Sequence, residues 1–403
     1  MNKGKIINDP VYGFISFPEP ELMQIIEHPW FQRLRNIRQM GMANLVYPGA
    51  VHTRFHHSMG ACHLMGIALE KLKLKGVEFT ETECVAARIA ILLHDVGHGP
   101  FSHALEHSLV EGVPHETISR FIMKSMEKEF GGPLDIAQQI FSHAYPKDYL
   151  HQLVSSQLDM DRMDYLNRDS FYSGVSEGVI GYDRILQMLT VRNGELMVEE
   201  KAVHSVEKFI IARRLMYWQV YLHKTVLGAE HLIINILTRA KELARSGADL
   251  FATPALRFFL YHPISAIDFQ DGDLLRVFCE LDDTDVLASI KVWQSHKDPT
   301  LSKLCKMLIN RNLYKVTLSS STIDELLEEK QKLALTKEGI TPENLHYFVN
   351  SGSTTNNTYN IDDERIYIAM KDGSVRDISE MDDPLVNQTS AKPVLKNYIY
   401  YIR

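Results

Sequence analysis

One stretch of the sequence, from Ile91 to His103, most constrains what this chain can fold into. An apolar run ends in the pair His94-Asp95, and a glycine-rich break with two further histidines, His98 and His103, follows at once. A histidine and an aspartate at the end of a buried helix can bind the same metal ion, and the glycines let a substrate approach the backbone closely. The pair alone is a weak signal, because such dipeptides also occur by chance.

Histidine is concentrated around this stretch. Nine of the 18 histidines lie within 64 residues, where an even distribution would place about three; they are at positions 52, 56, 57, 63, 94, 98, 103, 107 and 115. Such clustering indicates metal, phosphate or proton-transfer chemistry. Arg54 and His57 are three residues apart on an expected helix, so one can contact an anion while the other binds a metal. A surface helix with solvated charges is the competing interpretation, and the His94-Asp95 pair makes us favour function.

A second dense cluster, residues 159–169, places carboxylates along one helical face. Asp161, Tyr165 and Asp169 recur at every fourth position and therefore share a stripe. Acidic residues often only face solvent, and Arg162 and Arg168 could pair with them there. Carboxylates and a tyrosine on a single stripe nevertheless suit a metal ligand together with contacts to a sugar or a phosphate.

Two imidazoles and two carboxylates are thus available to one ion, from His57, His94, Asp95 and Asp161. This set suits Mn²⁺, Fe²⁺, Ni²⁺, Zn²⁺ or Mg²⁺, with positions left for water and a phosphate oxygen. The residue types alone do not choose among these ions.

The composition is that of an ordinary soluble globular protein, with 45% apolar and 23% charged residues. The net charge of −8 argues against a general nucleic-acid binder. The four cysteines are widely spread and form no CxxC pair, which suits reduced thiols in the cytoplasm. We expect neither a signal peptide nor a transmembrane span, because no run of 18 apolar residues occurs.

Helical periodicity dominates the first part of the chain, and strand-like segments occur later. We expect a mainly α fold, with a helical catalytic core over residues 1–250 and a smaller α+β lobe over residues 251–403 that serves oligomerisation or regulation. His28-Pro29 should divide the first helical stretch, and Asn193-Gly194 should form the turn of a small hairpin. One long helix from about residue 203 to 244 and a polar loop over residues 351–357 are also expected.

Several motifs occur in an order that resembles the HD-domain metal-dependent phosphohydrolases. They are Phe31-Gln32-Arg33-Leu34-Arg35, Tyr47-Pro48-Gly49-Ala50, Arg54-Phe55-His56-His57-Ser58, HDVGHGPFSH, Met163-Asp164-Tyr165 and Asp282-Asp283-Thr284-Asp285. Over roughly residues 8–320 the chain is similar to one branch, that of the sterile-alpha-motif-and-HD-domain dNTP triphosphohydrolase of vertebrates and its bacterial homologues. The sterile alpha motif itself is not in this sequence.

The resemblance implies an enzyme that hydrolyses deoxynucleoside triphosphates, dGTP among them, to a deoxynucleoside and tripolyphosphate. It implies one divalent ion on His57, His94, Asp95 and Asp161, with Mg²⁺ accompanying the substrate phosphates. It also implies a cytoplasmic homodimer or homotetramer that binds an activating nucleotide at an interface. We expect no membrane partner and no strong nucleic-acid binding.

The resemblance further assigns roles to individual positions. The catalytic group comprises His98, His103, Glu106 and His115. In it, His103 is the general acid for the departing 5′ oxygen and Glu106, three residues on, is its partner. The substrate contacts comprise Gln39, Arg54, Arg162, Tyr165, Asp169, Arg213 and Tyr221, the last of which crowds the 2′ position of the sugar. The allosteric contacts comprise Glu27, Gln32 and Arg35, and Glu27 stands where the family has Asp, so guanine specificity stays open.

Two alternatives remain open. The first is a phosphohydrolase of the same fold that acts on another nucleotide phosphoester, such as a nucleoside monophosphate or a cyclic nucleotide. The second is a nucleotide sensor with vestigial catalysis, against which the complete ligand set argues. A cyclic-dinucleotide phosphodiesterase is disfavoured, because no Gly-Tyr-Pro motif follows the His-Asp pair.

Overall fold

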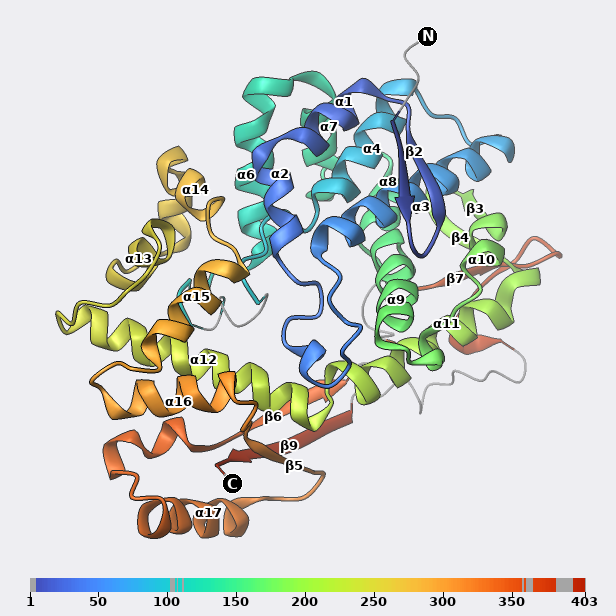
Figure 1. The fold of residues 1–403 in the computed structure, drawn as a ribbon. Helices are drawn as coiled ribbons and strands as arrows, with labels where there is room; N and C mark the ends of the chain where they lie inside the picture. The colour runs from blue at the N-terminus through green and yellow to red at the C-terminus, as the bar shows by residue number, and fades with distance from the viewer. Residues whose placement is uncertain are drawn as a thin grey trace.

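The structure, a computed structural model, describes residues 5–101, 106, 108–110, 112–356, 359, 365–381 and 394–402. In these ranges helices make up most of the regular structure, and three small sheets accompany them (Figure 1). The expected mainly α fold with an α+β part toward the C-terminus is confirmed. None of the helices that the structure describes has both the length and the apolar character needed to cross a membrane.

A small antiparallel hairpin and two short helices begin the described chain. Strand β1 (Lys5–Asp9) pairs with β2 (Gly13–Phe17), and α1 (Pro20–Glu27) and α2 (Pro29–Gln32) follow. The predicted division at His28-Pro29 is confirmed, because a proline has no N–H to donate inside a helix. The ring of His28 also accepts a hydrogen bond from the backbone N–H of Trp30, in the first turn of α2.

A bundle of helices carries the histidine motifs. It consists of α3 (Arg54–Leu74), α4 (Glu81–Leu93), α6 (His115–Phe130), α7 (Gly132–Phe141), α8 (Asp148–Val154) and α9 (Met160–Ser173). Helix α3 packs against both α4 and α9. Thr80 and Glu83 form a capping box that fixes where α4 begins. The buried face of α4 ends at Leu93, and the His-Asp pair therefore stands directly at the end of a rigid element.

The next segment contains the predicted hairpin. After α10 (Tyr182–Met188), β3 (Leu189–Arg192) pairs with β4 (Glu195–Glu199), and the turn residues Asn193 and Gly194 have the positive φ values that a type I′ turn needs. Strands β7 (Tyr367–Ala369) and β8 (Val375–Asp377) complete this sheet in the order β3-β4-β7-β8. The sheet joins residues from both sides of the boundary at residue 250, and that boundary stays a prediction.

The single helix expected from residue 203 to 244 is wrong. The structure has α11 (Val203–Met216), a π-helical turn over Tyr217–Tyr221, and α12 (Lys224–Arg245). His223 is extended and caps α12, its ring accepting a hydrogen bond from the N–H of Thr225 at 3.2 Å. Apolar periodicity runs through all three pieces, so the pattern could not reveal the break; π turns of this kind are frequent at functional sites.

The C-terminal part consists of short helices and a three-stranded sheet. The helices are α13 (Pro254–Tyr261), α14 (Gly272–Phe278), α15 (Asp283–Trp293), α16 (Pro299–Ile309) and α17 (Asp324–Lys337). The sheet has the order β5-β9-β6, with β5 (Lys315–Ser319), β6 (Val349–Asn356) and β9 (Val394–Tyr401). Helix α12 crosses the molecule with the bundle above it and this sheet below it (Figure 1).

The polar loop expected over residues 351–357 is wrong for residues 351–356, which belong to β6 and pair with β9; residue 357 lies outside the described residues. Backbone pairing with β9 overrides the weak strand preference of the serine-, glycine- and asparagine-rich stretch. Gly352 lies opposite Tyr398, and a Cβ at Gly352 would stand 2.5 Å from the Tyr398 hydroxyl. Any larger residue at this position would have to displace the Tyr398 side chain.

Candidate active site

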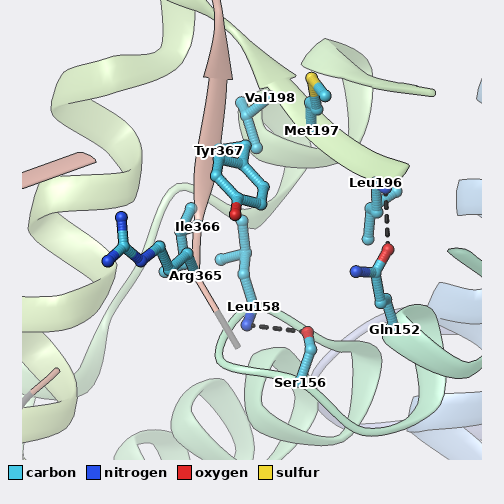
Figure 2. A pocket seen from close by; sticks show the side chains of 9 residues that line it. All are labelled: Gln152, Ser156, Leu158, Leu196, Met197, Val198, Arg365, Ile366 and Tyr367. Atoms are coloured by element: carbon cyan, nitrogen blue, oxygen red, sulfur yellow. Dashed lines mark hydrogen bonds between the residues drawn. The ribbon is translucent and has the colours of Figure 1, made fainter. Parts of the chain in front are cut away.

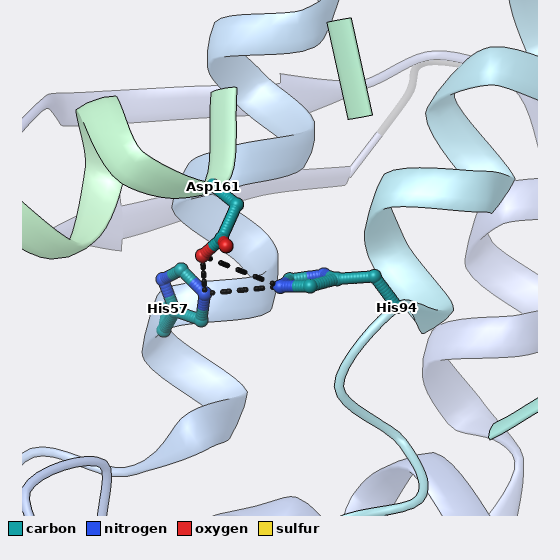
Figure 3. Close-up of side chains that lie close together, drawn as sticks. All are labelled: His57, His94 and Asp161. Carbon is teal, nitrogen blue, oxygen red and sulfur yellow. Dashed lines mark hydrogen bonds and ion pairs between the residues drawn. The ribbon is translucent and has the colours of Figure 1, made fainter. Parts of the chain in front are cut away.

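Side chains from three separate parts of the bundle converge on one point. His57 lies on α3, His94 and Asp95 follow α4, and Asp161 stands in the first turn of α9. The His57 Nε2 atom lies 3.3 Å from His94 Nε2 and 3.0 Å from Asp161 Oδ1 (Figure 3). His94 Nε2 also lies 3.5 Å from Asp161 Oδ1 and 3.3 Å from Asp95 Oδ1. The structure thus brings His57, His94 and Asp161 within reach of one ion, and Asp95 contacts both histidines while also grouping with His98 and His115.

Contacts at the remote ring nitrogens show that this group fits a cation. His57 Nδ1 lies 2.8 Å from Asp164 Oδ2, and His94 Nδ1 lies 2.6 Å from the carbonyl oxygen of Ile91. Both partners are acceptors, so each Nδ1 carries a hydrogen, and each Nε2 points to the shared point, where a cation would take the place of its proton. Metal-binding histidines are oriented in this way, by an acceptor on the other ring nitrogen.

Electrostatics lead to the same conclusion. Burial opposes a charge on His57, but Asp161 and Asp164 outweigh burial and raise its pKa to about 10. At His94 burial is likewise opposed by Asp95 and Asp161, and the pKa is raised. Carboxylates therefore surround the two imidazoles with negative charge that a divalent cation would offset.

A buried chain of charged groups supports His57 from behind. Arg168 Nε and Nη2 each donate to Asp164 at 2.9 Å, and Nη1 donates to Asp9 Oδ2 at 2.8 Å. Arg168 is fully buried, so the interpretation that placed it in solvent is wrong. The sequence analysis missed the role of Asp164, for which the signal was its spacing of four residues from Arg168 on one helix.

Next to the ligand group, two of the predicted catalytic histidines stack on each other. The rings of His98 and His115 lie 3.6 Å apart with an angle of 20° between them. His115 Nδ1 is 3.0 Å from Glu106 Oε1, and His98 Nε2 is 3.4 Å from Asp95 Oδ1. Burial and the nearby Arg54 lower the pKa of His98 well below its usual value, which keeps the ring neutral at neutral pH.

The fourth predicted catalytic residue, His103, lies outside the described residues. Its pairing with Glu106 therefore stays a prediction. Glu106 itself is half-buried and contacts His115, a partner that the sequence spacing had not indicated.

A cavity of about 460 Å³ opens beside this cluster. Five of the seven predicted substrate residues line it, namely Gln39, Arg54, Tyr165, Asp169 and Tyr221. Its volume lies in the usual range for a small-molecule site. Tyr217, which sequence analysis missed, lies four residues before Tyr221 and lines the cavity too, and Leu222, Glu230 and His231 line it as well.

The other two predicted substrate residues, Arg162 and Arg213, do not line this cavity. Arg162 Nε donates to Asp159 Oδ2 at 3.1 Å, and the Arg213 guanidinium lies 5.9 Å from the centroid of the Tyr217 ring. Burial raises the pKa of Tyr165, whereas the positive charges of Arg213 and Arg162 oppose that rise, so both arginines stand near the cavity wall. The buried Arg213 Nε has no hydrogen-bond acceptor among the described residues.

A smaller cavity of about 20 Å³ lies between α8 and strands β4 and β7 (Figure 2). Gln152 and Ser156 border it, and both bond to the backbone, at the N–H of Leu196 and of Leu158 respectively. A cavity of this size holds about one water. It is therefore a packing feature and not a second ligand site.

The predicted allosteric residues lie near the start of the bundle. Arg35 Nε donates to Gln32 Oε1 at 2.7 Å, and its guanidinium stacks over the Phe55 ring at 3.6 Å. Glu27 is exposed and pairs with Lys5 at 3.2 Å. Gln32 and Arg35 thus form one unit, whereas Glu27 has a different partner, and the allosteric role of the three stays a prediction.

Comparisons with known proteins agree with this geometry. The chain matches the HD domain over residues 54–169 and the HD associated region over residues 180–248. A solved phosphohydrolase from Bacteroides thetaiotaomicron is similar with a TM-score of 0.95 and 49% identity, covering 99% of this chain and 100% of that one. A protein from Aquifex aeolicus has a TM-score of 0.75 at 28% identity, with 99% and 97% covered.

Curated relatives extend the comparison. YwfO of Bacillus subtilis is 31% identical, and the match covers 100% of this chain and 93% of the relative. The deoxynucleoside triphosphate triphosphohydrolase SAMHD1 homolog of Dictyostelium discoideum is 30% identical over 82% of this chain, and SAMHD1 of Bos taurus is 29% identical over 77%. The chain spans 62% and 58% of the lengths of these last two relatives. With its converging His, His-Asp and Asp ligands, the chain belongs to the HD-domain phosphohydrolase family, in the branch that contains the SAMHD1 proteins and their bacterial homologues.

Proposed function

We propose that this chain hydrolyses deoxynucleoside triphosphates to a deoxynucleoside and tripolyphosphate. The observation that carries the proposal is the cavity of about 460 Å³, which includes Arg54 at the metal-ligand cluster and extends to Glu230 and His231. A cavity of this size accommodates a nucleoside beside a phosphate site. The names of the SAMHD1 relatives support the same substrate class.

The four converging side chains, His57, His94, Asp95 and Asp161, would hold one divalent cation. When bound, such a cation lowers the pKa of a water and withdraws charge from a phosphoryl oxygen. The protein holds its ligands ready for this, since Arg54 donates to Asp95 Oδ2 and Asp164 fixes the ring of His57. Which metal the protein uses stays open among Mn²⁺, Fe²⁺, Ni²⁺, Zn²⁺ and Mg²⁺.

Arginines around the cavity would bind the triphosphate. Arg54 lies at the cavity and at Asp95, and Arg162 and Arg213 stand behind the wall near Tyr165. Arg162 and Arg213 do not line the cavity, so they would act on a bound phosphate through their positive charge. Charge on the equatorial oxygens would thereby be offset during attack at the α-phosphorus.

The stacked histidines would serve proton transfer. Burial and Arg54 keep the His98 ring neutral, and Glu106 holds the His115 ring in place through Nδ1. His103 remains the proposed general acid that protonates the departing 5′ oxygen, so that it does not leave as an alkoxide. The sugar would lie against Gln39, Asp169 and Tyr221.

The decisive experiment incubates the purified protein with each dNTP and Mn²⁺ or Mg²⁺ and identifies the phosphate product. Deoxynucleoside and tripolyphosphate are expected, with activity lost on chelation and restored by metal. Deoxynucleoside monophosphate with pyrophosphate, or diphosphate with orthophosphate, would contradict the proposal. The same panel, repeated with a second nucleotide present, tests for an activator.

We also propose that the protein assembles as a homodimer or homotetramer and binds a regulatory nucleotide near Gln32 and Arg35. The support is the hydrogen bond that joins these two side chains and the place of the chain in the SAMHD1 branch. Light scattering with and without dNTPs tests the assembly. A monomer under both conditions would contradict it.

A further inference from the structure

We infer that His52 is a positioning residue: it orients the residues of the cavity wall against which the sugar would lie. It does not line the cavity, but it holds the Asp169 side chain and the backbone of Gln39, which do. This inference rests on the proposed function, because the sugar contacts belong to it. His52 would determine how well the site binds deoxyribose without contacting the substrate.

The contact with Asp169 is short and buried. His52 Nε2 lies 2.7 Å from Asp169 Oδ1, and the His52 side chain is 0% exposed. The other carboxylate oxygen, Oδ2, accepts a hydrogen bond from the Tyr221 hydroxyl at 2.6 Å. Each oxygen of Asp169 is therefore fixed by one donor. Without the His52 contact, the carboxylate could turn, and the Tyr221 hydroxyl would move with it.

The ring of His52 is itself fixed. An ionised carboxylate only accepts, so the proton of the contact sits on Nε2, and Nδ1 has no hydrogen-bond partner among the described residues. Tyr172 stacks on the ring at a centroid distance of 4.4 Å and an angle of 18°. Tyr172 and Asp169 are three residues apart on α9, so one helix face supplies both the stacking surface and the acceptor.

The backbone of His52 holds a second part of the wall. Its carbonyl oxygen accepts from the N–H of Gln39 at 3.1 Å, and the N–H of Arg54 donates to the carbonyl of Ile37 at 2.9 Å. Arg38 and Thr53, which lie between these two hydrogen bonds, form an isolated antiparallel β-bridge. Gln39 Oε1 is buried and accepts no hydrogen bond from the described residues, so it could accept one from a ligand hydroxyl.

Two variants separate the donor from the stacking ring. His52→Phe keeps a ring for Tyr172 but removes the donor to Asp169, whereas His52→Gln keeps an N–H donor at a similar reach. Wild type and both variants are assayed with a dNTP, with the matching rNTP, and with bis(4-nitrophenyl) phosphate, which has no sugar. Metal content and urea unfolding are measured alongside.

In His52→Phe we expect the KM for the dNTP to rise about tenfold, the effect of losing one hydrogen bond to a charged group, and the preference for dNTP over rNTP to fall. Hydrolysis of bis(4-nitrophenyl) phosphate and metal content should stay within about twofold of wild type, since the metal ligands are untouched. His52→Gln should restore most of the KM, since it restores the donor.

Three results would overturn the inference: an unchanged KM in His52→Phe, an equal loss with the sugar-free ester, or an equal loss in both variants. A failure of the proposed function is separate and visible in wild type, which would then hydrolyse the sugar-free ester but none of the dNTPs.

Discussion

At His57, an imidazole ring lies between two carboxylates that have different tasks. Asp161 faces Nε2 at the shared metal point, whereas Asp164 binds Nδ1 at 2.8 Å and is 0% exposed. Asp164 also accepts from Arg168, so its orientation is fixed before any metal binds. The orientation of a proposed metal ligand thus depends on a residue that would not itself touch the ion.

Replacing Asp164 by Asn should weaken metal binding about 10- to 100-fold, because the amide NH2 must face either Nη2 of Arg168 or the two donors at the other oxygen, His57 Nδ1 and Arg168 Nε. Metal content after dialysis against a buffered chelator measures the effect. Asp9→Asn is the matched control, since it removes a carboxylate from the same Arg168 without touching His57. Equal metal content in wild type and Asp164→Asn would contradict this account.

His94 and His98 are four residues apart but should separate metal binding from chemistry. His94→Ala removes an imidazole from the ligand group and should lose the metal. His98→Ala should keep the metal and lose about 100-fold or more in turnover, the usual range for a group that handles protons or orients phosphate. Metal analysis and kinetics on the same preparations measure both, and loss of metal from His98→Ala would instead make His98 a ligand.

The ligands themselves were predictable at the residue scale, but their supports were not. His94-Asp95 and the stripe through Asp161 are local patterns that a helical period reveals. One interpretation placed Arg168 in solvent as the partner of acidic residues on its own helix. Arg168 is instead buried, and it pairs with Asp9, which is far away in the sequence. Only the tertiary fold brings such partners together, so the sequence alone carries no signal for them.

Among the elements, the loop after the His-Asp pair is held from both ends. Arg33 donates to the carbonyl of His98 at 2.9 Å and to that of Leu281 at 3.0 Å. Asp283, at the start of α15, accepts from the N–H of Phe101 at 2.9 Å. A segment from the C-terminal part thus fixes the loop that carries His98, the proposed catalytic histidine.

Gly97 lets this loop approach α6. A Cβ at Gly97 would stand 2.2 Å from the carbonyl oxygen of His115 and 2.4 Å from the N–H nitrogen of Ser119, both rigid backbone atoms. Gly97→Ala should therefore displace α6 and cost about 1–3 kcal/mol in the free energy of unfolding, with turnover reduced because His115 moves. Urea unfolding and kinetics measure the two effects. Gly132→Ala, with no atom within 4 Å of its Cβ, is the control and should change neither.

The hydrogen bond between Asp283 and the loop after the His-Asp pair should make the stability of the protein depend on pH. Burial raises its pKa from 3.8 to about 6, although the N–H groups of Phe101 and Arg38 oppose the rise. The folded state therefore binds this proton more tightly than the unfolded chain. The resulting stabilisation is complete below about pH 4 and is lost as the pH rises through 6, by about 3 kcal/mol in all.

Urea unfolding of wild type and Asp283→Asn between pH 4 and 7 tests this sign. The wild-type free energy of unfolding, taken relative to the variant, should fall across that range, because all other titrating groups are common to both proteins. A difference that does not change with pH would contradict the shifted carboxyl. A rising difference would mean that ionised Asp283 is favoured by the fold.

The elements that sequence patterns predicted well are those held by local interactions. Proline divides α1 from α2, and Asn193-Gly194 turns the hairpin. The two failures depend on distant partners: β6 exists because β9 pairs with it, and α11 ends where the chain turns around the cavity at Tyr217–Tyr221. Propensity and period describe neither of these contacts.

Over the whole molecule, the contacts described above tie the two predicted units together. Strand β7 pairs with β4 across the predicted boundary. Arg33 and Asp283 join the catalytic loop to residues 281–283. Many of these bonds are buried, so separating the units would leave polar groups without partners.

We therefore expect one cooperative unfolding transition rather than two. Trp30 lies in α2, and Trp293 lies in α15 with its Nε1 donating to the carbonyl of Phe251, so each reports on a different side of residue 250. The chain has a third tryptophan, Trp218, which both variants must also lack. In variants whose single tryptophan is Trp30 or Trp293, urea unfolding by fluorescence should give the same midpoint, and circular dichroism should agree with both. Separate midpoints would instead make residues 1–250 and 251–403 independent folding units. The bonds of Arg33 and Asp283 between the two units would then add little to the stability of either.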